Sequence, residues 1–178
     1  MATKLDLFAT HGGAESSSLL GTSGGAHVYN LKAHEDLDNG CVVALGTYSG
    51  TDIDVWNAMN PKEATSHVFL VLQSEEIYED YTNSYLDVKR FFNAKGDVVR
   101  CYDLKPLDRF AIAAESFGTN AEAAAVGKYL IVEAEQNRLQ VADAPVAGGF
   151  SAYIYDIATN GKFRAIVISN GDLKIVTA

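Results

Sequence analysis

Beyond residue 26 the chain alternates short runs of Val, Ile, Tyr and Phe with turn residues, and this rhythm constrains the fold more than any other feature. Such runs favour β-strands, because β-branched and aromatic side chains pack well on a pleated sheet surface. Long helical periodicity is missing from the same stretch. Ten strands are expected, over residues 27–31, 40–48, 66–73, 97–103, 109–114, 128–133, 138–142, 151–157, 162–169 and 173–176.

Turn residues, among them Asp38-Asn39-Gly40, separate these runs and support the strand assignment. The Asn-Gly pairs at Asn160 and Asn170 predict tight hairpins, in which both central residues take positive φ. A short helix is expected over 120–126, with Asn120 as its N-cap and Gly127 as its stop. Regularly spaced strands with few helices predict a mainly β domain, a single barrel or sandwich with one or two short helices.

Residues 1–26 differ from the rest in composition. Residues 10–26 hold five Gly and four Ser among seventeen residues, so this stretch has too little apolar surface to repay the entropy of ordering it. We therefore predict an extended N-terminal arm over 1–26, mobile in the isolated protein, and a globular β domain over 27–178. Leu5, Leu7 and Phe8 alternate near the start of the arm and form an apolar patch that is predicted to contact a partner or a neighbouring subunit.

Charge and cysteine usage restrict the partners and the compartment. The net charge of −9 would repel nucleic acid and acidic membrane surfaces, so neither is expected as a partner. An acid at residue 6 argues against a signal peptide, and no apolar run is long enough for a membrane span, which predicts folding in a cytoplasm. Cys41 and Cys101 lie in apolar runs and are expected as buried free thiols, with a disulfide left open.

Residue patterns that carry catalysis are missing or out of context. Residues 21–25 match G-x-S-x-G, but a Ser-rich segment precedes them where a nucleophile elbow needs a buried strand. The four histidines are scattered, and no phosphate or dinucleotide motif occurs. We expect no enzyme activity, cofactor or metal. The acids between residues 31 and 80 leave a calcium site or a hydrolase open as alternatives, and the candidate calcium ligands are Asp52 with Asp54 or Glu76 with Asp80.

The segment 75–93 is unusually aromatic for a solvated loop. It is predicted either to bind a partner or to fold over the domain's own sheet. The residues expected to make the contact are Tyr78, Tyr81, Tyr85, Arg90 and Phe92. The residues expected in the core are Val43, Leu45, Phe69, Val71, Ile131, Ile154, Ile166 and Ile168.

An ordered series of short signatures resembles a known family. It begins with LDNGCVVALG at 37–46, continues with YLD at 85–87, FFNAKG at 91–96 and RCYDL at 100–104, and ends with VGKYL at 126–130. Over residues 27–178 this order resembles the capsid-associated proteins of tailed bacteriophages, the head decoration or cement proteins.

The resemblance implies a structural virion protein without enzymatic activity. Its partners would be the major capsid protein and neighbouring copies of itself, and it would lie on the capsid exterior after synthesis in the host bacterial cytoplasm. The alternative is a phage fibre or carbohydrate-binding β module, with Trp56 and the tyrosines of 75–93 as stacking platforms.

Overall fold

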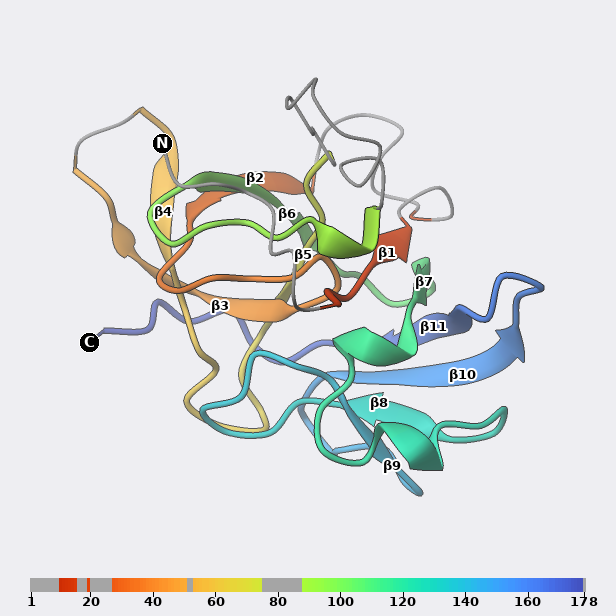
Figure 1. The fold of residues 1–178 in the computed structure, drawn as a ribbon. Helices are drawn as coiled ribbons and strands as arrows, with labels where there is room; N and C mark the ends of the chain where they lie inside the picture. The colour runs from red at the N-terminus through yellow and green to blue at the C-terminus, as the bar shows by residue number, and fades with distance from the viewer. Residues whose placement is uncertain (1–9, 16–18, 20–26, 51–52, 75–87, 178) are drawn as a thin grey trace, which may run out of the picture.

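The computed structural model describes residues 10–15, 19, 27–50, 53–74 and 88–177, and it is mainly β, as predicted. Five strands close a barrel in the order β2-β4-β3-β5-β6, shown in the upper left of Figure 1. Among the barrel strands of the described residues, only the β2–β4 pairing is parallel. The barrel strands are β2 (Val28–Lys32), β3 (Val42–Tyr48), β4 (Val55–Met59), β5 (Phe69–Val71) and β6 (Val98–Asp103).

A second, open sheet lies beside the barrel, in the lower right of Figure 1. Its six strands have the order β1-β7-β11-β10-β8-β9, and every neighbouring pair is antiparallel. Its strands are β1 (Ala14–Glu15), β7 (Arg109–Ile112), β8 (Tyr129–Ile131), β9 (Gln140–Ala142), β10 (Ser151–Ile157) and β11 (Phe163–Ser169).

Strand alternation joins the two sheets through a shared core. On β3 and β5, Val43 and Phe69 belong to the cluster of buried residues of the barrel, whereas Val42 and Leu70 belong to a second cluster. That second cluster also contains Ile154 and Val167 from the open sheet. Successive side chains of a strand point to opposite faces, so β3 and β5 serve both cores at once.

Most of the predicted strands occur, with one predicted strand absent near the C-terminus and one additional strand in the barrel. Residues 173–176 contain no strand, so that prediction is wrong, and residues 55–59 form a strand that was not predicted. Residues 173–175 are exposed on the surface. Strand β4 was missed because Asn57 interrupts its apolar run; the Asn57 side chain donates to the backbone oxygen of Thr47 at 3.1 Å.

Both of the predicted Asn-Gly hairpins need correction. The loop from β10 to β11 closes with Ala158 N donating to Lys162 O, and in the Asn160-Gly161 pair only Gly161 has positive φ. This is a three-residue loop with glycine in the left-handed position. No strand follows Asn170-Gly171, so no hairpin forms there.

The predicted helix over 120–126 is one 3₁₀ turn, η5 (Ala121–Ala123). Asn120 does not cap it, because its side chain instead hydrogen-bonds the backbone of Val141 on β9. The other 3₁₀ turns of the described residues are η3 (Val88–Arg90) and η4 (Ala114–Ser116). Within the described ranges no helix is long and apolar enough to cross a membrane.

For part of residues 1–26 the structure differs from the predicted arm. Ala14 and Glu15 form β1, which pairs with Ile112 and Ala111 of β7, and Leu19 is buried in the shared core. Residues 10–15 and 19 are therefore part of the domain rather than a separate extension. Residues 1–9, 16–18 and 20–26 lie outside the described residues.

The predicted core is correct on the barrel and partly wrong on the open sheet. Val43, Leu45, Phe69, Val71 and Ile154 are buried, as expected. Ile131 and Ile166 are half-buried, and Ile168 is 47% exposed. Strand β11 buries Ala165 and Val167 instead, so the small residues of the strand face the core and the isoleucines face outward.

Candidate functional site

Of the residues predicted to contact a partner, the structure describes two. Arg90 and Phe92 are half-buried beside η3. The other six, Leu5, Leu7, Phe8, Tyr78, Tyr81 and Tyr85, lie outside the described residues. The site is therefore built around the described residues that flank the two predicted contact segments.

The N-terminal segment and the end of segment 75–93 lie against each other. The His11 ring stacks on Phe92, with 5.0 Å between ring centroids and 25° between ring planes. The His11 backbone N–H donates to the carbonyl oxygen of Lys89 at 2.6 Å. Residues 10–11 and 89–92, which border the two segments, thus meet at one place on the molecule.

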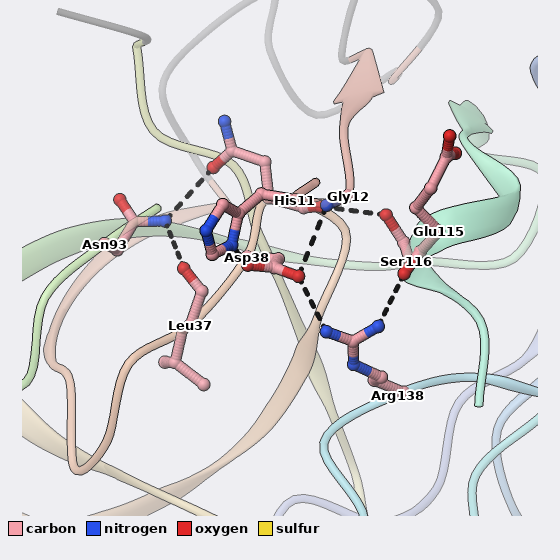
Figure 2. Close-up of polar contacts among 9 residues, drawn as sticks. His11, Gly12, Leu37, Asp38, Asn93, Glu115, Ser116 and Arg138 are labelled. Atoms are coloured by element: carbon pink, nitrogen blue, oxygen red, sulfur yellow. Dashed lines mark hydrogen bonds and ion pairs between the residues drawn. The ribbon is translucent and has the colours of Figure 1, made fainter. Parts of the chain in front are cut away.

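A buried carboxylate, Asp38, holds the N-terminal segment at this place (Figure 2). Its Oδ1 lies 2.6 Å from His11 Nδ1, and its Oδ2 accepts from the Gly12 N–H at 3.2 Å. The same Oδ2 accepts from the Arg138 guanidinium at 2.7 Å. Arg138 also donates to the Glu115 carbonyl oxygen at 2.5 Å, so Asp38 ties the N-terminal segment, a barrel loop and the region of the open sheet together.

Asparagine side chains complete the same region (Figure 2). Asn93 Nδ2 donates to the Leu37 carbonyl oxygen at 2.9 Å and lies 3.3 Å from Asn39 Oδ1. Asn39 in turn accepts from the Gln73 N–H and donates to the Gln73 carbonyl oxygen, each at 3.0 Å. Buried backbone groups need such partners, so the loops around Asp38 are fixed by hydrogen bonds.

Two glycines allow the chain segments to come this close. A Cβ at Gly12 would lie 2.1 Å from the Ser116 hydroxyl, and one at Gly40 would lie 2.8 Å from it. Gly40 also has φ of +94°. Gly12 is therefore needed because the backbone packs directly against Ser116. Composition alone had predicted that this part of the chain is a mobile arm.

The chemistry of this cluster, which we call the Asp38 joint (His11, Gly12, Asp38, Ser116 and Arg138), is structural. Both carboxylate oxygens of Asp38 already accept hydrogen bonds. The Ser116 hydroxyl, the one hydroxyl of the cluster, donates to the Asn39 carbonyl oxygen at 3.1 Å. Across the described parts of the chain, no group of three His, Cys, Asp or Glu side chains is placed to hold a metal ion. Of the acids considered for calcium, Asp54 is exposed and Asp52, Glu76 and Asp80 lie outside the described residues.

Sequence reasoning did not identify the Asp38 joint. Asp38 and Arg138 are 100 residues apart, and His11 lies 27 residues before Asp38. A single sequence carries no signal that brings these residues together, because His11 falls in the predicted arm, Asp38 in a turn and Arg138 at the start of a predicted strand. The Asp-Asn-Gly run at 38–40 was correctly assigned to a turn, and only its partners were missing.

A second buried polar cluster lies where β11 ends against the barrel. His67 Nε2 lies 2.7 Å from Asp103 Oδ1, and His67 Nδ1 lies 2.6 Å from the Gly171 carbonyl oxygen. Lys105 approaches the other Asp103 oxygen at 2.6 Å. Burial by itself would raise the pKa of Asp103, but hydrogen bonds from His67 and Lys105 and their charges bring it below its ordinary value.

The remaining candidate groups are accounted for by packing. Cys41 and Cys101 are buried free thiols, as predicted; burial raises the pKa of Cys41 to about 12 and that of Cys101 further. Trp56 is half-buried and meets Tyr48 edge-on, with 5.7 Å between ring centroids.

Comparison with protein-family models, with curated proteins and with solved structures finds no match for this chain.

Proposed function

We propose that this protein is a structural virion protein that decorates or cements the capsid of a tailed bacteriophage by binding the major capsid protein, and that it has no enzymatic activity. The ordered signatures over residues 27–178 are the reason for naming this family. In this proposal the protein is made in the host cytoplasm and ends on the capsid exterior, beside other copies of itself.

The observation that carries the proposal is the meeting of the two predicted contact segments. His11 stacks on Phe92 and its backbone N–H donates to the Lys89 carbonyl oxygen, so the described residues that follow 1–9 and those that follow 75–87 meet at one place. Aromatic and Arg side chains commonly dominate interface energies, and both kinds border this point as Phe92 and Arg90.

The Asp38 joint gives this point its rigidity. A binding segment that starts from a fixed anchor loses less entropy on docking than one that starts from a free chain end. Asp38 is buried and is bonded by two other chain segments, at His11–Gly12 and at Arg138, and this makes it the fixed base of such an anchor.

Co-sedimentation with purified capsids that lack this protein tests the proposal. We expect the wild-type chain to pellet with capsids to a saturating occupancy. The double variant Tyr81→Ala with Tyr85→Ala is expected to lose binding at unchanged melting temperature, and Tyr48→Ala, a half-exposed tyrosine on the barrel, is the matched control.

Two results would contradict the proposal. Wild-type protein that stays in the supernatant with intact capsids would remove the function itself. A double variant that loses thermal stability while its capsid occupancy is unchanged would make segment 75–93 a cover for the domain, and would leave residues 1–9 as the binding element.

A fibre or carbohydrate-binding module is the second candidate, and the Trp56–Tyr48 pair favours it. Tyr48 is 50% exposed and contacts the half-buried indole edge-on. Exposed aromatic pairs provide faces for sugar rings. Binding to a glycan array that Trp56→Ala abolishes, together with absence of capsid binding, would favour this candidate over the first.

A further inference from the structure

The outward face of the open sheet is apolar where a solvated face would be polar. Strands β8, β10 and β11 bury Leu130, Ala152, Ile154, Ala165 and Val167 toward the barrel. Because strand side chains alternate, the intervening residues face away from it. The apolar residues among them, which we call the outer face, are Tyr129, Ile131, Tyr153, Tyr155, Ile166 and Ile168; Arg164 of β11 lies on the same side.

Side chains of the outer face contact one another across the strands. Tyr153 is paired directly with Ile166 on β11 and with Tyr129 on β8. The Tyr129 and Tyr153 rings meet edge-on, with 5.5 Å between centroids. The centre of the sheet thus presents a continuous row of tyrosines and isoleucines rather than isolated apolar residues.

Within the part of the chain that the structure describes, these six residues belong to neither buried cluster. Ile168 is 47% exposed and Tyr155 is 38% exposed, and the other four are half-buried. Antiparallel sheets with one solvated face normally carry polar residues there. Apolar side chains that stay partly exposed together on one sheet face are typical of an interaction surface.

Charge identifies the kind of partner. Residues 1–103 hold 7 Lys and Arg against 15 Asp and Glu, whereas residues 104–178, which contain this face, hold 7 against 8. The acidic half of one molecule repels the acidic half of another, but the open sheet is close to neutral. At the edge of the outer face, Arg109 and the Arg164–Asp156 ion pair supply both signs of charge. Such an edge can complement itself in a second copy.

We propose that the outer face is a self-association surface, through which two copies of this chain pack sheet against sheet. Face-to-face packing of two sheets, about 10 Å apart, is the ordinary way in which such surfaces are buried. The partner is a second copy, and the contact is isologous, so that each copy contributes the same residues. The proposal does not depend on capsid binding.

Sedimentation velocity of the purified full chain, without capsids, tests it. We expect a dimer at about 10 µM protein. The double variant Ile166→Thr with Ile168→Glu keeps strand-forming residues at the half-buried position and places a charge on the face. Its dimer dissociation constant should rise by at least about 100-fold, at an unchanged monomer fold by circular dichroism. Ile53→Glu, at an isoleucine that is 87% exposed elsewhere, is the matched control and should remain a dimer.

Disulfide trapping gives a second, independent measurement. The two native thiols are buried, so Ile168→Cys introduces one accessible thiol and Ile53→Cys introduces another away from the face. Mild oxidation should give a covalent dimer of Ile168→Cys, and the Ile53→Cys control should stay monomeric.

Three results would overturn the proposal. They are a wild-type chain that is monomeric at about 100 µM, a charged variant that still forms dimers, and equal trapping of the two cysteine variants. If the wild-type chain is monomeric and Ile166→Thr with Ile168→Glu lowers capsid occupancy, the occupant of the face is the capsid protein and not a second copy. Because the assay contains no capsid, its failure leaves the proposed capsid binding untouched.

Discussion

The barrel and the open sheet use the same kind of strand in opposite ways. The barrel closes on itself, so each of its five strands has two hydrogen-bonded neighbours, and its interior holds side chains such as Leu31, Val43 and Phe69. The open sheet keeps two edges, packs one face on the barrel and presents Tyr153 and Ile166 on the other.

This difference separates scaffold from surface. Closure removes the edges through which strands recruit partners. The open sheet offers two ways to bind another segment or molecule. Its β7 edge pairs with β1 of the N-terminal segment, and its outer face carries apolar side chains. The barrel is therefore expected to determine stability, and the open sheet and the Asp38 joint to determine what the molecule binds.

The largest expected effect on stability comes from comparing two apolar side chains, one from the barrel and one from the open sheet. Phe69→Ala empties the centre of the barrel and should lower the free energy of unfolding by about 3–5 kcal/mol. Ile166→Ala on the outer face should cost less than about 1 kcal/mol, because its side chain is half-buried. Urea unfolding at concentrations that keep the chain monomeric measures both.

Ile154→Ala is the control for that pair, since Ile154 is fully buried on the inner face of the same sheet. It should cost about 2–5 kcal/mol. An Ile166→Ala variant as damaging as Ile154→Ala would show that the outer face is covered within the monomer.

The second test breaks the contact between the two regions. Asp38→Ala leaves His11 and Arg138 without their buried acceptor and should lower the free energy of unfolding by about 2–3 kcal/mol. The loss is below that of a fully buried pair, because the Arg138 side chain is 40% exposed. Asp156→Ala removes the partner of Arg164 in an exposed ion pair and should cost at most about 0.5 kcal/mol. Equal losses from the two variants would make the Asp38 joint an ordinary surface pair.

The third test concerns the N-terminal segment and uses two adjacent glycines. Gly12→Ala would bring a Cβ against Ser116 and should cost about 1–2 kcal/mol, while lowering capsid occupancy by displacing the segment. Gly13→Ala meets no atom within 4 Å and should change neither. Thermal melts and co-sedimentation measure the two effects. If Gly12→Ala matches Gly13→Ala in both, residues 10–15 are not held at the joint.

The smallest expected effect is a pH dependence at the second polar cluster. The pKa of Asp103 is below its ordinary value, so the folded state binds this proton less readily than the unfolded state. The stability that Asp103 supplies is complete above the unfolded value of about 3.9 and is lost as pH falls from there through the folded pKa. Asp103→Asn should flatten this part of the profile in urea unfolding between pH 5 and about 2. A variant with the full wild-type slope would assign the acid sensitivity to other carboxylates.

Several local features could be predicted because they depend on neighbouring residues only. The strand Ser151–Ile157 agrees with its prediction at both ends, since a run of Tyr and Ile between turn residues leaves no other choice. The buried thiols followed from the apolar runs around them. The exposure of Ile166 and Ile168 could not be predicted, because both faces of β11 are apolar and only the barrel decides which face is covered.

Asparagines show where sequence information ends. Asn39 and Asn170 were assigned to turns and Asn120 to a helix cap, but the sequence did not indicate that each side chain pairs with a distant backbone. Each side chain accepts from the N–H and donates to the carbonyl oxygen of one residue, namely Gln73, Val141 and Val68. An asparagine amide has one acceptor and one donor side, so it can replace a strand neighbour wherever the backbone lacks one.

The sequence by itself determined that this chain is a mainly β protein, that its thiols are buried and that its acids gather in the first 103 residues. These properties depend on side-chain type and on the spacing of neighbouring residues. Tertiary structure alone decided that Asp38 joins His11 to Arg138 and that the isoleucines of β11 face outward. Both depend on packing between segments tens of residues apart, where the same local pattern fits several partners and only the shared core selects one.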